Sequence, residues 1–188
     1  MCRGRNVSVR RTLNPGAMNM RRILLFVLLL LVTAVALWDP PLSMPVAGAS
    51  AHDWHPDSFW YEPWGASGVH KGIDIFAGHG TPVEAPVAGL VLFSGEWRLG
   101  GNVVLLLAPG WRVHYLAHLQ QRNVTSATLV GAGHPLGTVG DSGNARGKPP
   151  HLHYSIVDLI PRPWRADATT QGWKKMFFRD PSVALAGS

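Results

Sequence analysis

The chain has 188 residues, a length that predicts one folded domain. Hydrophobic residues make up 46% of it and charged residues 15%, which is too apolar for a disordered protein. The 21 glycines and 15 prolines indicate many turns and argue against a bundle of helices. The single cysteine excludes an intramolecular disulfide framework, a cysteine-rich zinc finger and an iron–sulfur cluster.

The positive charge is concentrated at the N-terminus. The chain carries 17 basic and 11 acidic residues, a net charge of +6. Residues 1–49 hold six arginines against one acidic residue, Asp39, whereas residues 50–188 hold 11 basic and 10 acidic groups. A nucleic-acid partner requires a basic stripe on the folded part of the chain, and the sequence offers none. We therefore expect no nucleic-acid partner.

An uncharged apolar run covers residues 23–38 and follows the basic pair Arg21 and Arg22. Basic residues in front of an apolar segment indicate membrane insertion with the N-terminus in the cytoplasm. Two interpretations stay open: an anchor that remains in the inner membrane, or a signal peptide cleaved near the small residues 47–49. Either interpretation places the rest of the chain in the cell envelope. The domain would be in the periplasm, held by an inner-membrane anchor or secreted there after cleavage of the signal.

Composition divides the chain into five segments. We expect a basic cytoplasmic arm over residues 1–22, a transmembrane anchor or signal peptide over 23–38, and a linker rich in Pro, Ala, Ser and Gly over 39–57. A folded domain follows over 58–160, and a C-terminal tail over 161–188.

Short apolar runs alternate with Gly, Pro, Asn and Asp turn signals throughout the expected domain. No part of it keeps a 3.6-residue period, and the spacing of the runs is near that of a sandwich or barrel. The sequence therefore predicts a mainly β domain preceded by one hydrophobic helix. The runs that fit strands cover residues 81–83, 89–93, 102–107, 111–116 and 151–157.

Chemically active side chains gather in three short motifs. His70 and Asp74 are four residues apart, so on one strand both would point the same way. His151 and His153 occupy alternate positions of another predicted strand, and His118 lies where a third strand turns. Imidazole nitrogen and carboxylate oxygen together suit Zn2+. The sequence contains neither an H-E-x-x-H helix motif nor a G-x-S-x-G nucleophile elbow.

Residues 65–157 resemble the lysostaphin-type, LytM-like zinc metallopeptidases of family M23. Five motifs carry the resemblance, in the order and spacing of that family. They are Val69-His70-Lys-Gly-Ile-Asp74, Gly80-Thr-Pro-Val with Ala85-Pro and Gly89, Ala117-His118-Leu, Gly137 with Gly140-Asp-Ser-Gly143, and Pro150-His151-Leu-His153-Tyr.

The resemblance implies an antiparallel β domain with a long open groove and one zinc ion. It assigns His70, Asp74 and His153 as metal ligands and His118 and His151 as catalytic histidines. Three protein ligands leave a position for water, as in catalytic zinc sites. The implied activity is a zinc metalloendopeptidase that hydrolyses peptide cross-links of bacterial peptidoglycan with a metal-activated water. Which of the two catalytic histidines takes the proton stays open.

Two alternatives belong to other classes of protein. One is a catalytically silent regulator of this fold that binds and activates another cell-wall hydrolase, although such domains usually lose metal ligands. The other is a metal-binding or adhesion module of the cell surface. An enzyme of this kind could also need a protein activator. Leu116 occupies the position two residues before His118, where many family members have tyrosine. Which peptide bond is cleaved therefore stays open.

Four tryptophans could line the groove or pack in the core, and we expect two or three of them in the core. They are Trp60, Trp64, Trp97 and Trp111.

Overall fold

The computed structural model describes residues 19–186, and these residues fall into two units. The first unit ends at Ala34 and the second begins at Val35. Most of the basic arm expected at 1–22 lies outside the described residues.

The first unit is helical. Helix α1 (Met20–Leu37) has 18 residues and a mean hydropathy of 2.3, and it is long and apolar enough to cross a membrane. At 1.5 Å per residue it spans roughly 27 Å, close to the hydrocarbon thickness of a bilayer. Asn19 caps it, because its Oδ1 accepts a hydrogen bond of 2.9 Å from the Arg21 amide. The expected N-terminal hydrophobic helix is therefore confirmed.

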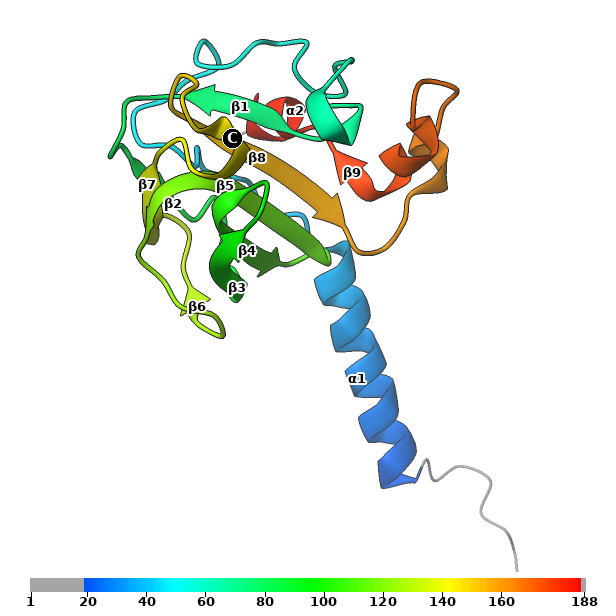
Figure 1. The fold of residues 1–188 in the computed structure, drawn as a ribbon. Helices are drawn as coiled ribbons and strands as arrows, with labels where there is room; N and C mark the ends of the chain where they lie inside the picture. Colours follow the sequence, from blue (N-terminus) through cyan, green and yellow to red (C-terminus); the bar gives the residue numbers. More distant parts are fainter. Residues whose placement is uncertain (1–18, 187–188) are drawn as a thin grey trace, which may run out of the picture. The chain divides into compact units, whose positions relative to one another are not determined.

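The second unit is built on one mainly antiparallel sheet of nine strands (Figure 1), which confirms the predicted fold class. The strands cover the five predicted runs and several shorter segments. They are β1 (Ile73–Phe76), β2 (Pro82–Glu84), β3 (Gly89–Trp97), β4 (Gly101–Ala108), β5 (Arg112–Arg122), β6 (Leu129–Val130), β7 (Pro135–Val139), β8 (His151–Asp158) and β9 (Phe178–Arg179). One short helix, α2 (Pro181–Ala186), follows the last strand.

The strand order brings the three motifs to neighbouring strands. The main path runs β1-β8-β5-β4-β3-β6, while β7 pairs with β5 and β2. Strand β8 therefore lies between β1 and β5. Its His153 stands opposite Asp74 on one side and opposite Ala117 on the other, next to His118. Three distant stretches of sequence thus meet in one row across the sheet.

Alternation along β8 divides the two faces of the sheet. Leu152, Tyr154 and Ile156 are fully buried in the hydrophobic core, whereas His151 and His153 point to the opposite face. Leu116 of β5 packs into the same core. A continuous apolar layer therefore packs on the face of the central strands opposite the histidines.

Part of the segment predicted as a linker packs on the domain. Leu42, Val46 and Trp54 are buried members of the core. Val46 forms an isolated bridge with Val83 of β2, and the Glu84 amide donates to the Pro45 carbonyl at 2.9 Å. Residues 39–57 therefore differ from the expected linker, because three isolated apolar side chains of this Pro- and Gly-rich segment are buried in the core of the domain.

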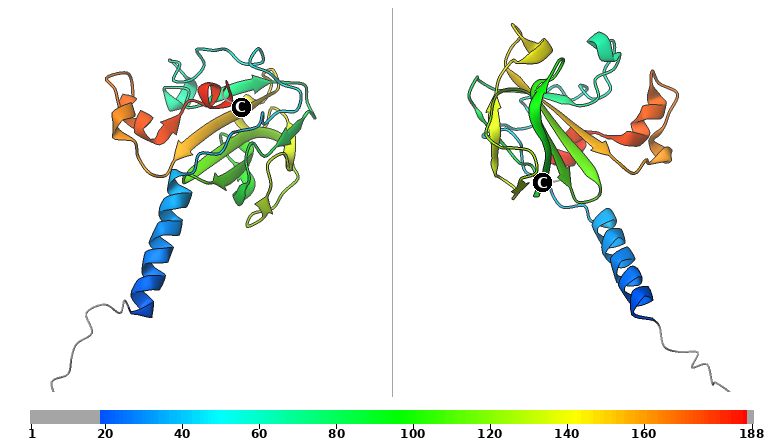
Figure 2. Two further views of the ribbon diagram at one scale, coloured as in Figure 1. Left: turned by 180° about the vertical axis from the view of Figure 1, so that it is seen from behind. Right: turned by 60° about the horizontal axis from the view of Figure 1, so that its bottom comes forward.

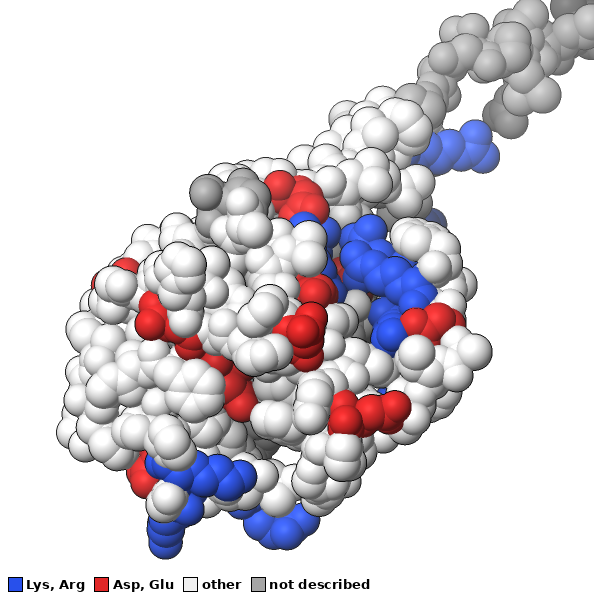
Figure 3. Space-filling model, turned by 90° about the horizontal axis from the view of Figure 1, so that it is seen from above, with Lys and Arg blue, Asp and Glu red and all other residues white. Residues whose placement is uncertain are grey.

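The C-terminal tail extends one edge of the sheet. Strand β9 pairs with Ile156 and Val157 of β8, beyond the region where β1 pairs, and the tail runs beside β8 in both views of Figure 2. Short 3-10 turns connect the two strands. The buried carboxylate of Asp158 binds arginines from β5 and from the tail, and Figure 3 shows basic and acidic groups close together on the face it draws.

Candidate metal centre and active site

Three donor atoms from His70, Asp74 and His153 converge on one point. Nε2 of His70 lies 3.1 Å from Oδ1 of Asp74 and 3.0 Å from Nδ1 of His153, and the last two atoms are 2.9 Å apart. Two ligands held about 2.0–2.1 Å from a tetrahedral zinc ion stand roughly 3.3 Å apart. The three distances between the donor atoms are slightly shorter than that, so the three side chains need to move apart only a little to reach zinc-binding geometry.

His70 reaches this point from outside strand β1, where the sequence pattern had placed it on the strand. Only Asp74 lies on β1. His70 sits in the preceding extended segment, whose backbone bonds to residues 60 and 61: the Trp60 amide donates to the His70 carbonyl and the His70 amide to the Tyr61 carbonyl. The Trp64 indole stacks on the imidazole at 4.0 Å between ring centroids. The loop thus orients His70 in place of strand alternation.

The outer ring atoms of both histidines are held by polar partners. Nδ1 of His70 lies 2.9 Å from the Ser58 carbonyl, to which it donates, so the Nε2 lone pair faces the centre. Nε2 of His153 lies 3.0 Å from the Ser155 hydroxyl, which leaves Nδ1 for the centre. Such outer partners fix the tautomer and the ring orientation of metal-binding histidines.

The donor set fits a divalent cation such as zinc. Burial opposes ionisation of Asp74, but its close contacts with the His153 and His70 rings outweigh burial and hold the pKa of this carboxyl far below its usual range. Burial lowers the pKa of His153, which keeps that imidazole neutral at neutral pH. Two lone pairs and a carboxylate therefore face one another at 3 Å, an arrangement that a bound cation stabilises.

His118 lies at a bulge in β5, a strand that continues past the turn expected there. The pairing of β4 with β5 shifts register between Asn102 and Val104, and His118 has a φ of 64°. A bulge of this kind redirects a side chain, and bulges are frequent beside active sites. Nδ1 of His118 donates to the Ser142 carbonyl at 2.9 Å. Burial lowers its pKa to about 4, so the imidazole is neutral at neutral pH.

His151 stands beside His118 at the start of β8. Its Nδ1 donates to the Pro149 carbonyl at 2.8 Å, and its Nε2 lies 3.8 Å from Oδ2 of Asp74. The ring centroids of His151 and His118 are 5.1 Å apart. The structure therefore brings all five predicted site residues together. His70, Asp74 and His153 form the cluster of donors, and His118 and His151 are the two neighbouring imidazoles.

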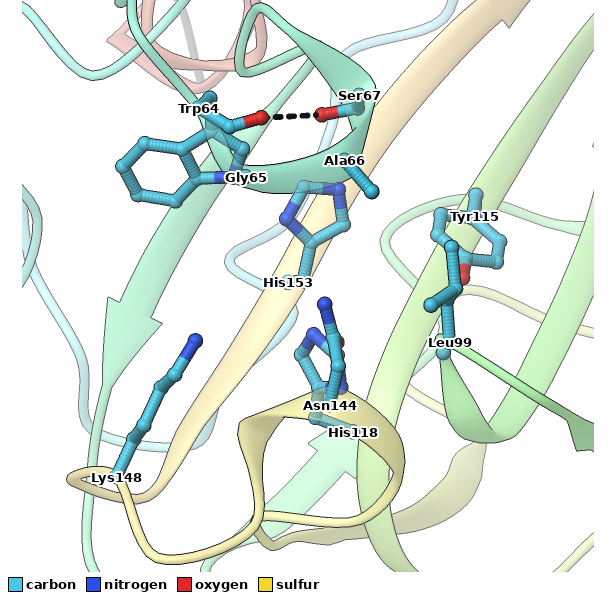
Figure 4. Close-up of a pocket in the computed structure, with 11 residues that line it drawn as sticks. Trp64, Gly65, Ala66, Ser67, Leu99, Tyr115, His118, Asn144, Lys148 and His153 are labelled. Atoms are coloured by element: carbon cyan, nitrogen blue, oxygen red, sulfur yellow. Dashed lines mark hydrogen bonds between the residues drawn. The ribbon is translucent and has the colours of Figure 1, made fainter.

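Two adjoining pockets of about 350 and 270 Å3 open over the centre and share five lining residues. Figure 4 shows the residues around the larger pocket, with Trp64 above, Tyr115 on the strand to the right, and Asn144 and Lys148 on the loop below. The shared residues are Trp64, His118, Asn144, Lys148 and His153. The two pockets form a continuous concave surface at which an extended chain can pass the donor atoms.

Only Trp60 of the four tryptophans considered is buried, fewer than the two or three expected in the core. Trp64 and Trp97 are exposed, and Trp54, from the supposed linker, takes a core position instead. Sequence reasoning also missed Ser155, Asn144 and Lys148. Ser155 alone carried a signal, because it lies two residues after His153 and so on the same face of β8.

The fold and the donor set define a small β domain that carries a His-Asp-His cluster able to hold a metal ion beside an open pocket. The family model of peptidase family M23 matches residues 68–162. The chain therefore belongs to peptidase family M23, as the sequence motifs indicated.

Its relatives include enzymes of the bacterial cell wall. The chain is 35% identical over 113 residues to the L-Ala–D-Glu endopeptidase of Bacillus subtilis, covering 55% of this chain and 35% of that one. It is 35% identical over 89 residues to the peptidoglycan DD-endopeptidase ShyC of Vibrio cholerae, covering 47% and 20%. The match thus spans about a third or less of these relatives.

A solved structure shares the fold. The catalytic domain of the antimicrobial peptidase lysostaphin from Staphylococcus simulans superposes with a TM-score of 0.57 at 26% identity, over 73% of this chain and 98% of that one.

Proposed function

We propose that the chain is a zinc-dependent endopeptidase that hydrolyses peptide cross-links of bacterial peptidoglycan. The observation that carries the proposal is the convergence of His70, Asp74 and His153 within 3.1 Å of one another at the floor of an open groove. His70, Asp74 and His153 would hold one zinc ion. When bound, zinc acidifies a water molecule and polarises the scissile carbonyl.

The two remaining histidines supply the proton transfers. Each donates its Nδ1 proton to a fixed backbone carbonyl, of Ser142 for His118 and of Pro149 for His151. Each therefore keeps its Nε2 for the reacting groups. One imidazole accepts the proton of the attacking water at Nε2 and passes it to the leaving amine, and the other stabilises the negative charge on the carbonyl oxygen when its own Nε2 carries a proton. Either can fill either role by position.

The substrate assignment comes from the relatives. Two of them are named as endopeptidases of peptidoglycan or of its L-Ala–D-Glu bond. A groove open at both pockets also suits an extended peptide better than a closed cavity would. The complete set of donors and neighbouring imidazoles disfavours the silent regulator as an alternative.

Helix α1 links the enzyme to the envelope in this proposal. Its length, its apolar composition and the arginines in its first turn support either a membrane anchor or a signal peptide, with the β domain in the periplasm. Cell-wall relatives agree with that placement.

Mass spectrometry of soluble fragments tests the proposal. Purified peptidoglycan is incubated with the full chain in non-ionic detergent, with and without a chelator. We expect new peptide ends, each carrying one added water, which disappear on chelation and return with zinc. Asp74→Ala should release no fragments, while Glu96→Ala, at an exposed carboxylate on β3, should release them normally.

Release that survives chelation would refute the metal mechanism. No release by a chain that holds one zinc would favour the regulator of another hydrolase.

A further inference from the structure

Lys148 is the one lysine or arginine that lines the two pockets of about 350 and 270 Å3, among the residues the structure describes. It borders both pockets, and the smaller one also contains Asp74, His151 and His153. Lys71 lines a further pocket beside His70 and His153, but its Nζ already donates to the Ser67 carbonyl at 3.0 Å. The positive charge of the exposed Lys148 side chain is therefore the one with access to whatever occupies the groove.

The backbone around Lys148 is held in place. Its amide donates to the Ala145 carbonyl at 2.9 Å, and the Gly147 amide donates to the Asp141 carboxylate at 3.2 Å. Pro149 and Pro150 follow, and their rings restrict the backbone up to the start of β8. The loop thus presents the lysine from a defined position.

The side chain of Lys148 rises from its loop into the pocket, with the ammonium group on the side where Trp64 lies (Figure 4). No hydrogen bond or ion pair of Nζ is found within residues 19–186. The nearby acidic group, Asp74, is already held by His70 and His153. The ammonium is therefore available to a ligand.

The balance of charges in the groove favours an anionic ligand. Asp74 contributes one negative charge at the floor, against the positive charge of Lys148 and the two of any divalent ion held there. Apart from Lys148 and the two imidazoles, the residues that line the larger pocket carry no charge, and they include the aromatic side chains of Trp64 and Tyr115. An anionic group within reach of Nζ gains a charge-assisted hydrogen bond, whereas an uncharged peptide gains none.

We propose that Lys148 binds a free carboxylate of the substrate, and that the preferred substrate is an acidic peptide whose carboxylate flanks the scissile bond. An uncharged bridge, such as one of glycine residues alone, lacks this contact. This inference rests on the proposed peptidase function and narrows it to a class of substrate.

A matched pair of peptides tests the inference. The two are identical except that one carries a free carboxylate next to the scissile bond and the other a carboxamide. Binding of each is measured by calorimetry on the zinc-supplied His118→Ala full chain, and the hydrolysis of each is measured on the wild type as kcat/KM. We expect the carboxylate peptide to be favoured about 10-fold in both measurements.

Variants of two neighbouring cations separate a specific contact from general charge. Lys148→Gln should abolish the preference and Lys148→Arg should retain it. Arg146→Gln should also retain it, because Arg146 is exposed two residues away and lines neither pocket.

Equal binding of the two peptides, or a preference that survives Lys148→Gln, would overturn the inference. A Lys148-dependent preference in binding without any hydrolysis would leave it standing and would count against the peptidase function instead.

Discussion

Lowering the pH from 7 to 5 should destabilise the β domain through one buried imidazole, that of His114. This residue lies on β5, and its Nδ1 is 2.7 Å from the Tyr154 hydroxyl. Burial, together with the charges of Arg112 and Arg179, lowers its pKa from 6.5 to about 3. The unfolded chain therefore binds a proton between pH 6.5 and 3 that the folded chain excludes, and stability falls as the pH drops through this window.

The expected magnitude follows from the two pKa values. At pH 5 the unfolded imidazole is almost fully protonated, about 1.5 units below its pKa, while the folded one remains neutral. One pKa unit corresponds to about 1.4 kcal/mol, so this group alone removes about 2 kcal/mol between pH 7 and pH 5.

Urea unfolding of the wild type and of His114→Gln measures the effect. Glutamine keeps a hydrogen-bonding group for Tyr154 but does not titrate. A chelator in every sample removes the contribution of metal loss, and the other histidines affect both proteins alike. The wild type should lose about 2 kcal/mol more than the variant between the two pH values. An equal loss in both proteins would show that His114 is not buried in its neutral form.

Two further predictions concern the support of the site and the extent of the domain. Ser155→Ala removes the partner of His153 Nε2 and should weaken zinc binding by about 10- to 100-fold, as measured by competition with a chelating dye; unchanged affinity would exclude this role for the hydroxyl. Val46→Ala should lower the free energy of unfolding by about 1–3 kcal/mol, since this side chain is fully buried against the β2 edge. Val183→Ala, at a largely exposed position, is the matched control, and equal stability of the two variants would restore the linker interpretation.

Strand alternation was sufficient to place neighbouring side chains on one face because it operates over short distances, whereas the meeting of His70, Asp74 and His153 was implied by the resemblance to family M23. His153 follows His151 by two residues on β8, so the pattern alone places both on one face. The spacing of His70 and Asp74 correctly predicted that the two side chains lie together, but it wrongly placed both residues on one strand. His70 lies before β1 and is oriented by loop contacts with residues 60 and 61, which no local period reports.

Features that depend on the backbone or on long-range packing were beyond sequence reasoning. The carbonyls of Ser142 and Pro149 orient the catalytic candidates, and a carbonyl has no residue signature. The bulge at His118 depends on a register shift between two paired strands. Val46 and Trp54 join the core from a segment whose composition resembles a linker, because isolated apolar residues without a period carry no signal of burial.

The metal content of three purified proteins tests the central claim most directly. Zinc per chain is measured by elemental mass spectrometry on the wild type, His118→Ala and Asp74→Ala after equal exposure to zinc. If His70, Asp74 and His153 hold the ion while His118 serves catalysis, the wild type and His118→Ala contain one zinc each and Asp74→Ala contains none. A zinc-free His118→Ala, or a zinc-replete Asp74→Ala, would contradict this assignment.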